Sequence, residues 1–300
     1  MKRRKKPSAW LVGFILIGTA CTPARKPAWE AQATSDVKPS VSPQQITDLR
    51  TQADAAWEQR AEKQQLLTTI NLWEQILAAD PEDGQLLTRL SRAYYFLGDG
   101  FYSAENAQEA ALGAYEKGIA AGERALMAIS PEFTKHIQAG DKVDDSVKFI
   151  QAEGQAGLYW YAVNLGRFAV TKGFTTTLFY KDRIHAVMQR VLDIDETFFH
   201  AAPHRYFGVF FAKAPAFAGG DMEKSKLHFD EALALDSRYF ATKVLYAEFY
   251  AAKIENKELF TRLLNEVKNA DPSVLPDLIP EQRVEQDKAK KLLSQIREIF

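Results

Sequence analysis

The chain has 300 residues, 46% of them hydrophobic and 26% charged, a composition typical of folded soluble proteins that excludes wholesale disorder. Its 38 basic and 39 acidic residues give a net charge of −1, so the total charge gives no indication of nucleic-acid binding. The single cysteine excludes an internal disulfide framework and any cysteine-rich zinc module.

Residues 1–20 have the pattern of a bacterial lipoprotein signal peptide. Five basic side chains fill positions 2–6, an apolar run follows at 9–17, and small residues precede Cys21. The apolar run is much shorter than the roughly 20 residues that a membrane-spanning helix needs. Position 18 holds Gly18, where such signals usually have Leu, and ordinary secretion is the alternative interpretation. We expect cleavage before Cys21 and lipidation of this cysteine, which anchors the protein stably without a transmembrane helix.

The segment after the signal peptide has the composition of a tether. Cleavage removes five basic residues and no acidic ones, so the mature chain is mildly acidic. Residues 21–43 contain few apolar side chains and four prolines, at positions 23, 27, 39 and 43, as flexible linkers do. Thr22, rather than an aspartate, follows Cys21, which leaves either the inner or the outer membrane open.

The remainder of the chain, residues 44–300, has helical periodicity. Apolar residues recur three and four positions apart in stripes at 46–57, 66–77 and 86–97, and proline or glycine closes the second and third stripes. One short run, 175–180, has a composition that favours a strand. The pattern predicts an all-α domain of about a dozen helices in antiparallel pairs, joined by short turns.

Several of these pairs resemble tetratricopeptide (TPR) repeats, whose period is 34 residues. Leu90, with the Ala-Tyr and Gly that follow it at 93–98, fits a first helix, and Ser225, Phe229 and Ala232 fit a second. Small residues there admit the bulky ring of the neighbouring helix, so each pair needs a neighbour to bury its apolar face. No repeat is complete, and Ser237 replaces an expected proline. We therefore predict a degenerate TPR-like α-solenoid.

The order of short motifs in the second half resembles the T component of tripartite ATP-independent periplasmic (TRAP) transporters, the TatT family. The motifs are VMQRVLD at 187–193, PHRYFGV at 203–209, GGDMEKS at 219–225, KVLYAEFY at 243–250, NKELF at 256–260 and DKAKKLL at 287–293. The resemblance implies a periplasmic, lipid-anchored homotrimer with a cleft or channel through each protomer. It also implies pairing with the substrate-binding P component of a transporter and uptake of a hydrophobic ligand such as a carboxylate.

The stretch 205–211 is apolar on nearly every helical face, and two interpretations stay open. A central packing helix is the simpler one, because aromatic clusters usually belong to cores. Alternatively, some of its rings line an apolar channel in which Arg205 binds a ligand carboxylate through a bidentate pair. The candidate ring residues are Phe198, Phe199, Tyr206, Phe210 and Phe211.

A second candidate group lies at i, i+1, i+4 and i+7 of another helix: Trp160, Tyr161, Asn164 and Arg167. This spacing allows Asn164 and Arg167 to reach one cavity together with the two aromatic rings. The alternative is that the rings are core residues and that Arg167 pairs with a surface acid.

The sequence contains no pattern that demands a metal, a cofactor or catalysis. His200 and His204 are four positions apart, but Pro203 interrupts the helix that would align them, so we expect no metal site. HExxH, GxSxG and Rossmann fingerprints do not occur. We predict a non-catalytic lipoprotein without cofactor that docks a periplasmic substrate-binding protein. The alternative is a TPR-like scaffold lipoprotein for envelope or outer-membrane assembly.

Overall fold

A computed structural model describes residues 25–30 and 42–300, so Cys21 and the predicted signal peptide lie outside the described residues. Throughout these ranges the chain is helical, with fourteen α-helices and no strand, which confirms the predicted all-α fold. The first eight helices are α1 (Pro43–Glu58), α2 (Lys63–Ala79), α3 (Gly84–Phe96), α4 (Gln108–Ile129), α5 (Pro131–Gln138), α6 (Val143–Ser146), α7 (Gln155–Lys172) and α8 (Phe174–Ile194). The rest are α9 (Phe198–Lys213), α10 (Met222–Leu235), α11 (Phe240–Leu245), α12 (Lys257–Asn269), α13 (Ile279–Ser294) and α14 (Ile296–Ile299).

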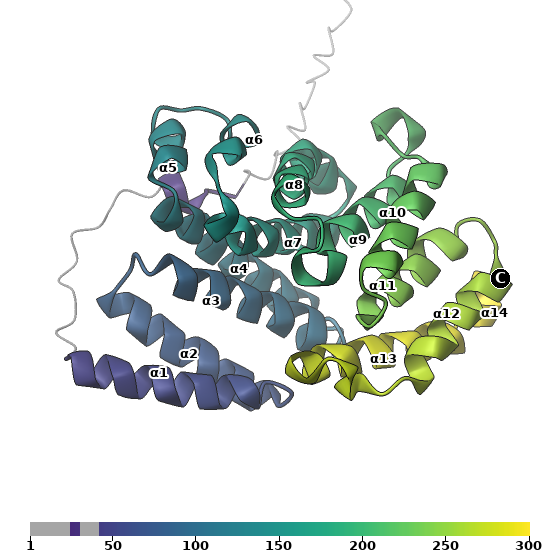
Figure 1. The fold of residues 1–300 in the computed structure, drawn as a ribbon, viewed down its shortest axis with the longest axis horizontal. Coiled ribbons are helices and arrows are strands. Elements are labelled where there is room, and N and C mark those ends of the chain that lie inside the picture. Colours follow the sequence, from purple (N-terminus) through teal and green to yellow (C-terminus); the bar gives the residue numbers. More distant parts are fainter. Residues whose placement is uncertain (1–24, 31–41) are drawn as a thin grey trace, which may run out of the picture.

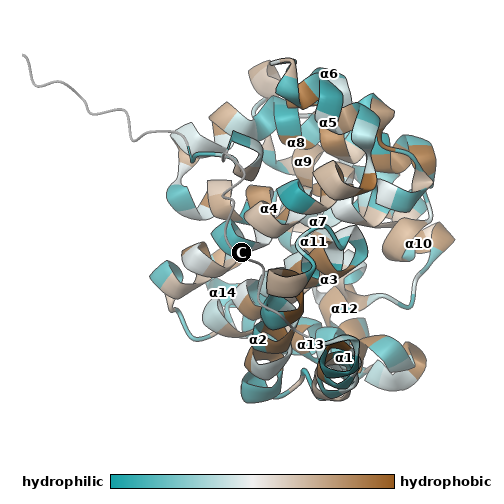
Figure 2. Ribbon diagram, turned by 90° about the vertical axis from the view of Figure 1, so that its left-hand side faces the viewer, coloured by the Kyte–Doolittle hydropathy of each residue, from teal (hydrophilic) through white to brown (hydrophobic). Residues whose placement is uncertain are grey.

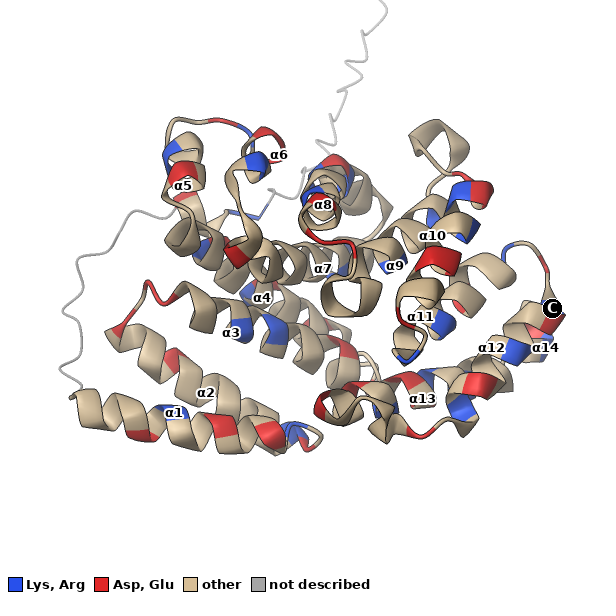
Figure 3. Ribbon diagram, in the orientation of Figure 1, with Lys and Arg blue, Asp and Glu red and all other residues tan. Residues whose placement is uncertain are grey.

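The helices pack mainly in sequential pairs, of which α1 with α2, α3 with α4, α7 with α8, and α9 with α10 are the clearest (Figure 1). Apolar and polar residues alternate around most helices (Figure 2), and charges of both signs are spread over the outer helices, whereas α7 carries few (Figure 3). Large aromatic side chains are fully buried between the helices, among them Trp73, Tyr115 and Phe229. None of the described helices is both long and apolar enough to span a membrane.

Close helix contacts depend on small residues that face large ones. A Cβ atom built on Gly208 of α9 would lie 2.9 Å from the ring of Phe229 on α10, and the Ser225 hydroxyl donates to the Gly208 carbonyl at 2.7 Å. A Cβ on Gly118 of α4 would lie 2.3 Å from Oδ1 of Asn164 on α7. This is the interlock expected of TPR-like pairs, although the repeat character itself stays a prediction.

The strand-favouring run at 175–180 is part of α8. Its composition is overridden because Tyr180, Ile184, Val187 and Val191 recur at helical spacing and are buried along one side of the helix. Periodic burial over 21 residues therefore decides the conformation of a six-residue run.

Two short π-helices, η2 (Leu97–Tyr102) and η6 (Tyr246–Ala251), have the same local construction. Each follows an α-helix directly, and each is followed by a turn with one left-handed residue, Asn106 or Glu255, both at φ 56°. Equivalent backbone hydrogen bonds close the turns, from Ala107 N to Tyr102 O at 2.8 Å and from Asn256 N to Ala251 O at 2.9 Å. The two π-helices are thus related parts of the two halves of the chain, and such segments often occur at functional sites.

Candidate functional site

The beginning of α9 contains a left-handed turn. Phe199, His200 and Ala201 have φ values of 44°, 59° and 58°, a region that costs L-residues roughly 1–2 kcal/mol each. The regular helix starts after Ala201, so Pro203 occupies its first turn, where a missing N–H group breaks no hydrogen bond. Backbone strain of this kind needs support from the surrounding structure and concentrates at functional sites.

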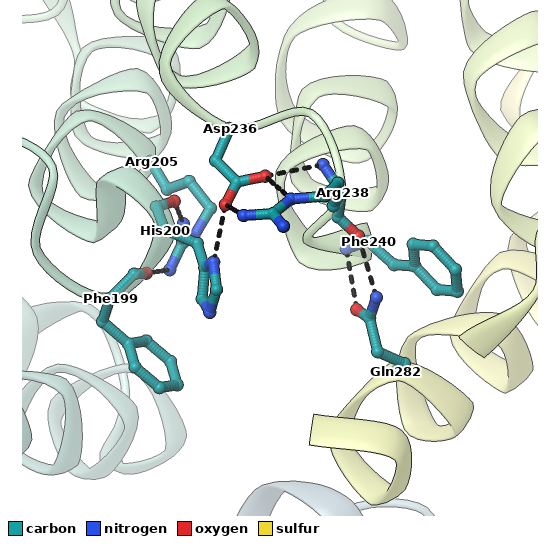
Figure 4. A network of polar contacts seen from close by, with 7 residues as sticks. All are labelled: Phe199, His200, Arg205, Asp236, Arg238, Phe240 and Gln282. Carbon is teal, nitrogen blue, oxygen red and sulfur yellow. Dashed lines mark hydrogen bonds and ion pairs between the residues drawn. The ribbon is translucent and has the colours of Figure 1, made fainter. Parts of the chain in front are cut away.

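Arg205 provides that support from one turn further along α9. Its Nη2 donates to the Phe199 carbonyl at 2.9 Å, and its Nη1 donates to the His200 carbonyl. Nδ1 of His200 lies 2.8 Å from Oδ2 of Asp236, which also accepts from Arg238 (Figure 4). Hydrogen bonds from Arg238 and His200 lower the pKa of Asp236, so this carboxylate stays ionised.

The same network reaches α13 through Gln282. Its Oε1 accepts from the Phe240 amide at 2.9 Å, and its Nε2 donates to the Arg238 carbonyl at 2.8 Å (Figure 4). Gln282 is fully buried, so both ends of its amide are satisfied inside the protein. The left-handed turn of α9 is therefore connected to α13 through the segment between α10 and α11.

Arg205 is a buried cation without a carboxylate partner. Only 3% of the residue is exposed, and within the described part of the chain no carboxylate oxygen lies within ion-pair distance. Its guanidinium lies 4.5 Å from the centroid of the Tyr239 ring. The two carbonyls use two of its five N–H donors.

Aromatic rings and a second arginine adjoin Arg205. The Phe199 ring centroid lies 5.1 Å from that of Trp160 and 5.5 Å from that of Tyr239. Arg92 of α3 lies over Trp160 at 5.5 Å and over Phe199 at 5.4 Å. Its Nη2 pairs with Glu281 at 2.8 Å, but its buried Nε has no hydrogen-bond partner among the described residues. The Tyr159 ring lies edge-on to Trp160, with 4.8 Å between the centroids. We call this set the arginine–aromatic cluster: Arg92, Tyr159, Trp160, Phe199, Arg205 and Tyr239.

Ionised side chains from both halves meet beside it. Asp99 of η2 forms ion pairs with Arg167 and with Lys288, each at 2.7 Å, and Lys288 also pairs with Glu285 at 2.7 Å. We call these residues, with Glu248 of η6, the charged cluster. Asp99 is buried, whereas 42% of the Arg167 side chain and 35% of the Lys288 side chain are exposed, so solvent reaches the cluster.

The pKa shifts in the charged cluster differ between the two acids of the π-helices. Burial would raise the pKa of Asp99, but the charges of Lys288 and Arg167 outweigh it and lower the pKa to about 2. Partial desolvation raises the pKa of Glu248, and the same two cations only reduce that effect. Asp99 is thus the acid that neutralises the cations, and Glu248 is the more readily protonated one.

The second predicted group divides between these clusters and the core. Trp160 belongs to the arginine–aromatic cluster, and Arg167 pairs with Asp99. Tyr161 and Asn164 are fully buried against other helices. Asn164 Nδ2 donates to the carbonyls of Ser91 and Trp160 at 3.0 and 2.8 Å, whereas its buried Oδ1 has no hydrogen-bond partner among the described residues.

The predicted rings of α9 also divide. Phe199 joins Arg205, whereas Tyr206 stacks on Phe210 at 6.0 Å, away from the guanidinium contacts. Phe210 lies 4.9 Å from His185 of α8, and Phe211 lies 5.5 Å from His228 of α10. Tyr206, Phe210 and Phe211 therefore fill the space between α8 and α10, and all three are half-buried.

Two hollows on the described surface lie elsewhere. One, of about 340 Å³, is bounded by α2, α3 and α4, and the other lies along α12, and neither is lined by residues of α9. Within residues 25–30 and 42–300, no three His, Cys, Asp or Glu side chains are grouped to hold a metal ion.

Sequence reasoning missed Arg92, Asp99, Tyr239 and Glu248. The Gly-Asp-Gly at 98–100 is the one local signal, because two glycines inside a helical pattern indicate a break that reorients Asp99. The remaining residues have no local signal, since their partners are far away in the sequence.

Paired helices packed around buried arginines and aromatic rings define an all-α helical-pair protein. A sequence model of the family described as the TRAP transporter T-component (TAtT) matches residues 62–300, a range that includes every residue of both clusters. The chain therefore belongs to the TRAP transporter T-component family, as its motifs predict, and this is a family of transport components. A search of curated proteins finds no match for this chain.

Proposed function

We propose that this protein is the accessory T component of a TRAP-type uptake system and that it docks the substrate-binding P component. The family match over residues 62–300 carries this proposal. The role is non-catalytic: the protein receives or holds a ligand and a partner without changing either. Stacked helix pairs supply the extended surface that such docking needs.

The arginine–aromatic cluster is the proposed ligand site, and its ligand is a hydrophobic carboxylate. Arg205 supports this choice because it is buried, positively charged and without a carboxylate partner in the described chain. The unsatisfied Nε of Arg92 is a second donor next to the same rings. A carboxylate between the two guanidinium groups would neutralise charge, and its apolar part would contact Trp160 and Phe199.

We also propose that the protein is a lipoprotein of the bacterial periplasm, anchored through Cys21 to the inner or outer membrane. The basic, apolar and small-residue regions before the single cysteine support this anchor. The homotrimer implied by the family resemblance is part of the same proposal.

A scaffold for envelope assembly is the second candidate. The packing of Phe210 and Phe211 between α8 and α10 favours it, because these rings contact neighbouring helices instead of lining a hollow. Such a protein would keep the docking surfaces and bind no small molecule.

Affinity capture separates the two candidates. The tagged full-length protein is expressed in a bacterium that carries a TRAP system, solubilised in mild detergent, captured and analysed by mass spectrometry. A second tagged lipoprotein of unrelated fold is the control for non-specific capture. We expect enrichment of a periplasmic substrate-binding protein. Enrichment of outer-membrane assembly proteins without any substrate-binding protein would contradict the transport proposal.

A further inference from the structure

Four large apolar side chains are exposed together where α7 ends and α8 begins. Their exposed fractions are 46% for Val170, 66% for Phe174, 45% for Leu178 and 64% for Phe179. Phe174 and Leu178 are one helical turn apart, Val170 is four positions earlier, and Phe179 follows Leu178. We call these residues the α7–α8 patch. Single exposed apolar residues are ordinary, whereas four within ten positions of the chain, two of them phenylalanines, indicate a surface that is covered in use.

The short segment 25–30 is attached to α4 and α7 of the body. Arg25 donates from Nη1 and Nη2 to the two carboxylate oxygens of Glu123, at 2.6 and 2.7 Å, and the Ala28 amide donates to the same carboxylate at 2.7 Å. The side chains of Arg25 and Glu123 are only 7% and 1% exposed. The Trp29 ring packs edge-on against Tyr161 at 5.9 Å. A buried bidentate ion pair and a ring contact thus hold this segment on α4.

Tyr180 connects the attached segment to the patch. Burial raises the pKa of the Tyr180 hydroxyl, and the positive charges of Arg183 and Arg25 oppose this rise, because both arginines are close to it. The Tyr180 ring also packs edge-on against Phe179, with 4.8 Å between the centroids. Tyr180 is buried whereas Phe179 is exposed, so the charge of Arg25 acts on the buried side of the turn of α8 whose exposed side carries the patch.

The chain between Arg25 and the expected anchor is short. Cys21 precedes Arg25 by four positions, and four residues span at most about 14 Å when fully extended. A lipid on Cys21 therefore keeps Arg25 within about 14 Å of the membrane surface, and α8 can be further away only by its own separation from Arg25. An anchor with this reach cannot hold the body far from the bilayer while Arg25 stays bound to Glu123.

We propose that the α7–α8 patch lies on the membrane surface, with Phe174, Leu178 and Phe179 inserted at the boundary between lipid headgroups and acyl chains. This inference rests on the proposed lipidation of Cys21. Aromatic and aliphatic side chains are typical of such shallow contacts, and the exposed Lys172 beside them suits anionic headgroups. The bound segment 25–30 then acts as a strap that sets the orientation of the body on the bilayer.

Lipid quenching tests this contact in the full-length lipidated protein. Because Cys21 is the only cysteine and is blocked by lipid, Phe179→Cys introduces a single site for an environment-sensitive fluorophore. Gln52→Cys on α1 is the matched control, exposed and on the opposite side of the molecule from α8 in Figures 1 and 2. The proteins are reconstituted in vesicles of phosphatidylethanolamine and phosphatidylglycerol that contain brominated acyl chains.

We expect a blue shift and strong quenching for the label at position 179, and neither effect at position 52. Adding Arg25→Ala and Trp29→Ala should abolish quenching at 179 while the protein still floats with the vesicles. Flotation without quenching at 179 would overturn the contact and leave the lipid anchor intact. Failure to float would overturn both. A blue shift that is already present in detergent and disappears on dilution would assign the patch to a second copy of the chain instead.

Discussion

Lys288 Nζ lies 2.7 Å from Oδ2 of Asp99, although the two residues are 189 positions apart. Asp99 is on the first π-helix and Lys288 is on α13, so this ion pair ties the N-terminal half of the body to its last long helix. Arg167 of α7 pairs with the other oxygen of the same carboxylate. One buried aspartate thus connects three segments beside the proposed ligand site.

Asp99→Asn should lower the free energy of unfolding at pH 7 by about 1–3 kcal/mol. The change leaves Arg167 and Lys288 without their negatively charged partner. The loss of stability is moderate because both side chains are partly exposed to solvent. Urea denaturation followed by circular dichroism measures the difference. Asp54→Asn, which breaks the exposed pair with Arg89, is the control and should cost no more than about 1 kcal/mol. Equal effects of the two variants would show that the charged cluster contributes no special stability.

Asp99 should also contribute to acid sensitivity. Its pKa in the folded protein is about 2, below the ordinary value of 3.8, so its ionised form stabilises the folded state above pH 4. That contribution is lost as the pH falls from about 4 to about 2. Stability measured across this range should therefore fall less steeply for Asp99→Asn than for the unaltered protein. Parallel curves would contradict the assignment.

The left-handed turn of α9 offers a paired glycine test. Ala201 and Ala212 are both fully buried in α9, but only Ala201 has a positive φ. Ala212→Gly should destabilise by about 1–2 kcal/mol through lost helix propensity and a lost methyl group. In Ala201→Gly the relief of backbone strain should offset the loss of the methyl group. The free energy of unfolding should therefore fall by only about 0–1 kcal/mol. Thermal and urea unfolding of both variants check the difference, and a larger loss at position 201 than at 212 would contradict a left-handed turn.

Arg205→Gln should remove the preference of the proposed site for carboxylates. Calorimetry with a medium-chain fatty acid and the alcohol of equal length compares the charged and neutral ligands. Loss of a charge-assisted hydrogen bond is worth about 1.5–3 kcal/mol, so the fatty acid should bind roughly 10-fold to 100-fold more weakly, with little change for the alcohol.

Two controls accompany this ligand experiment. Arg89→Gln removes an exposed arginine that lies over the Trp73 ring, and Phe210→Trp enlarges a ring that lies away from the Arg205 contacts. Neither should change the preference for the acid. Circular dichroism must show unchanged helicity for Arg205→Gln, because Arg205 also holds the left-handed turn. An unchanged preference in a folded Arg205→Gln protein would reject the site.

His228 should make stability depend on mildly acidic pH. Burial, His204 and Lys224 lower the pKa of His228 from 6.5 to about 4, and its ring packs between Phe207 and Phe211 as the neutral form. Because the unfolded chain binds the proton more readily, stability is complete above pH 6.5 and falls as the pH decreases towards 4. His228→Phe should flatten this part of the pH profile, with His136→Phe, on the smaller helix α5, as the control. A profile that His228→Phe leaves unchanged would contradict the prediction.

The sequence by itself determined the helices and the family. Periodic apolar residues indicate amphipathic helices because burial along one face depends only on spacing within a segment. Short motifs such as PHRYFGV at 203–209 identify the family without any knowledge of contacts. Arg205 was also a candidate from its residue type, as a cation within an apolar helix.

Only the tertiary structure decided which candidates share a site. Trp160 and Phe199 meet, whereas Asn164 turns into the core, because the packing of α7 against α3, α4 and α8 sets the direction of each side chain. The left-handed turn at Phe199 is held by the nearby Arg205 and by Asp236, which is 36 positions after His200. Gly-Asp-Gly at 98–100 signals a break in the helix, but the pairing of Asp99 with Lys288, 189 positions away, follows from no local pattern. The same holds for Arg25, four positions after the lone cysteine: its binding to Glu123 places a segment with tether-like composition on the folded body.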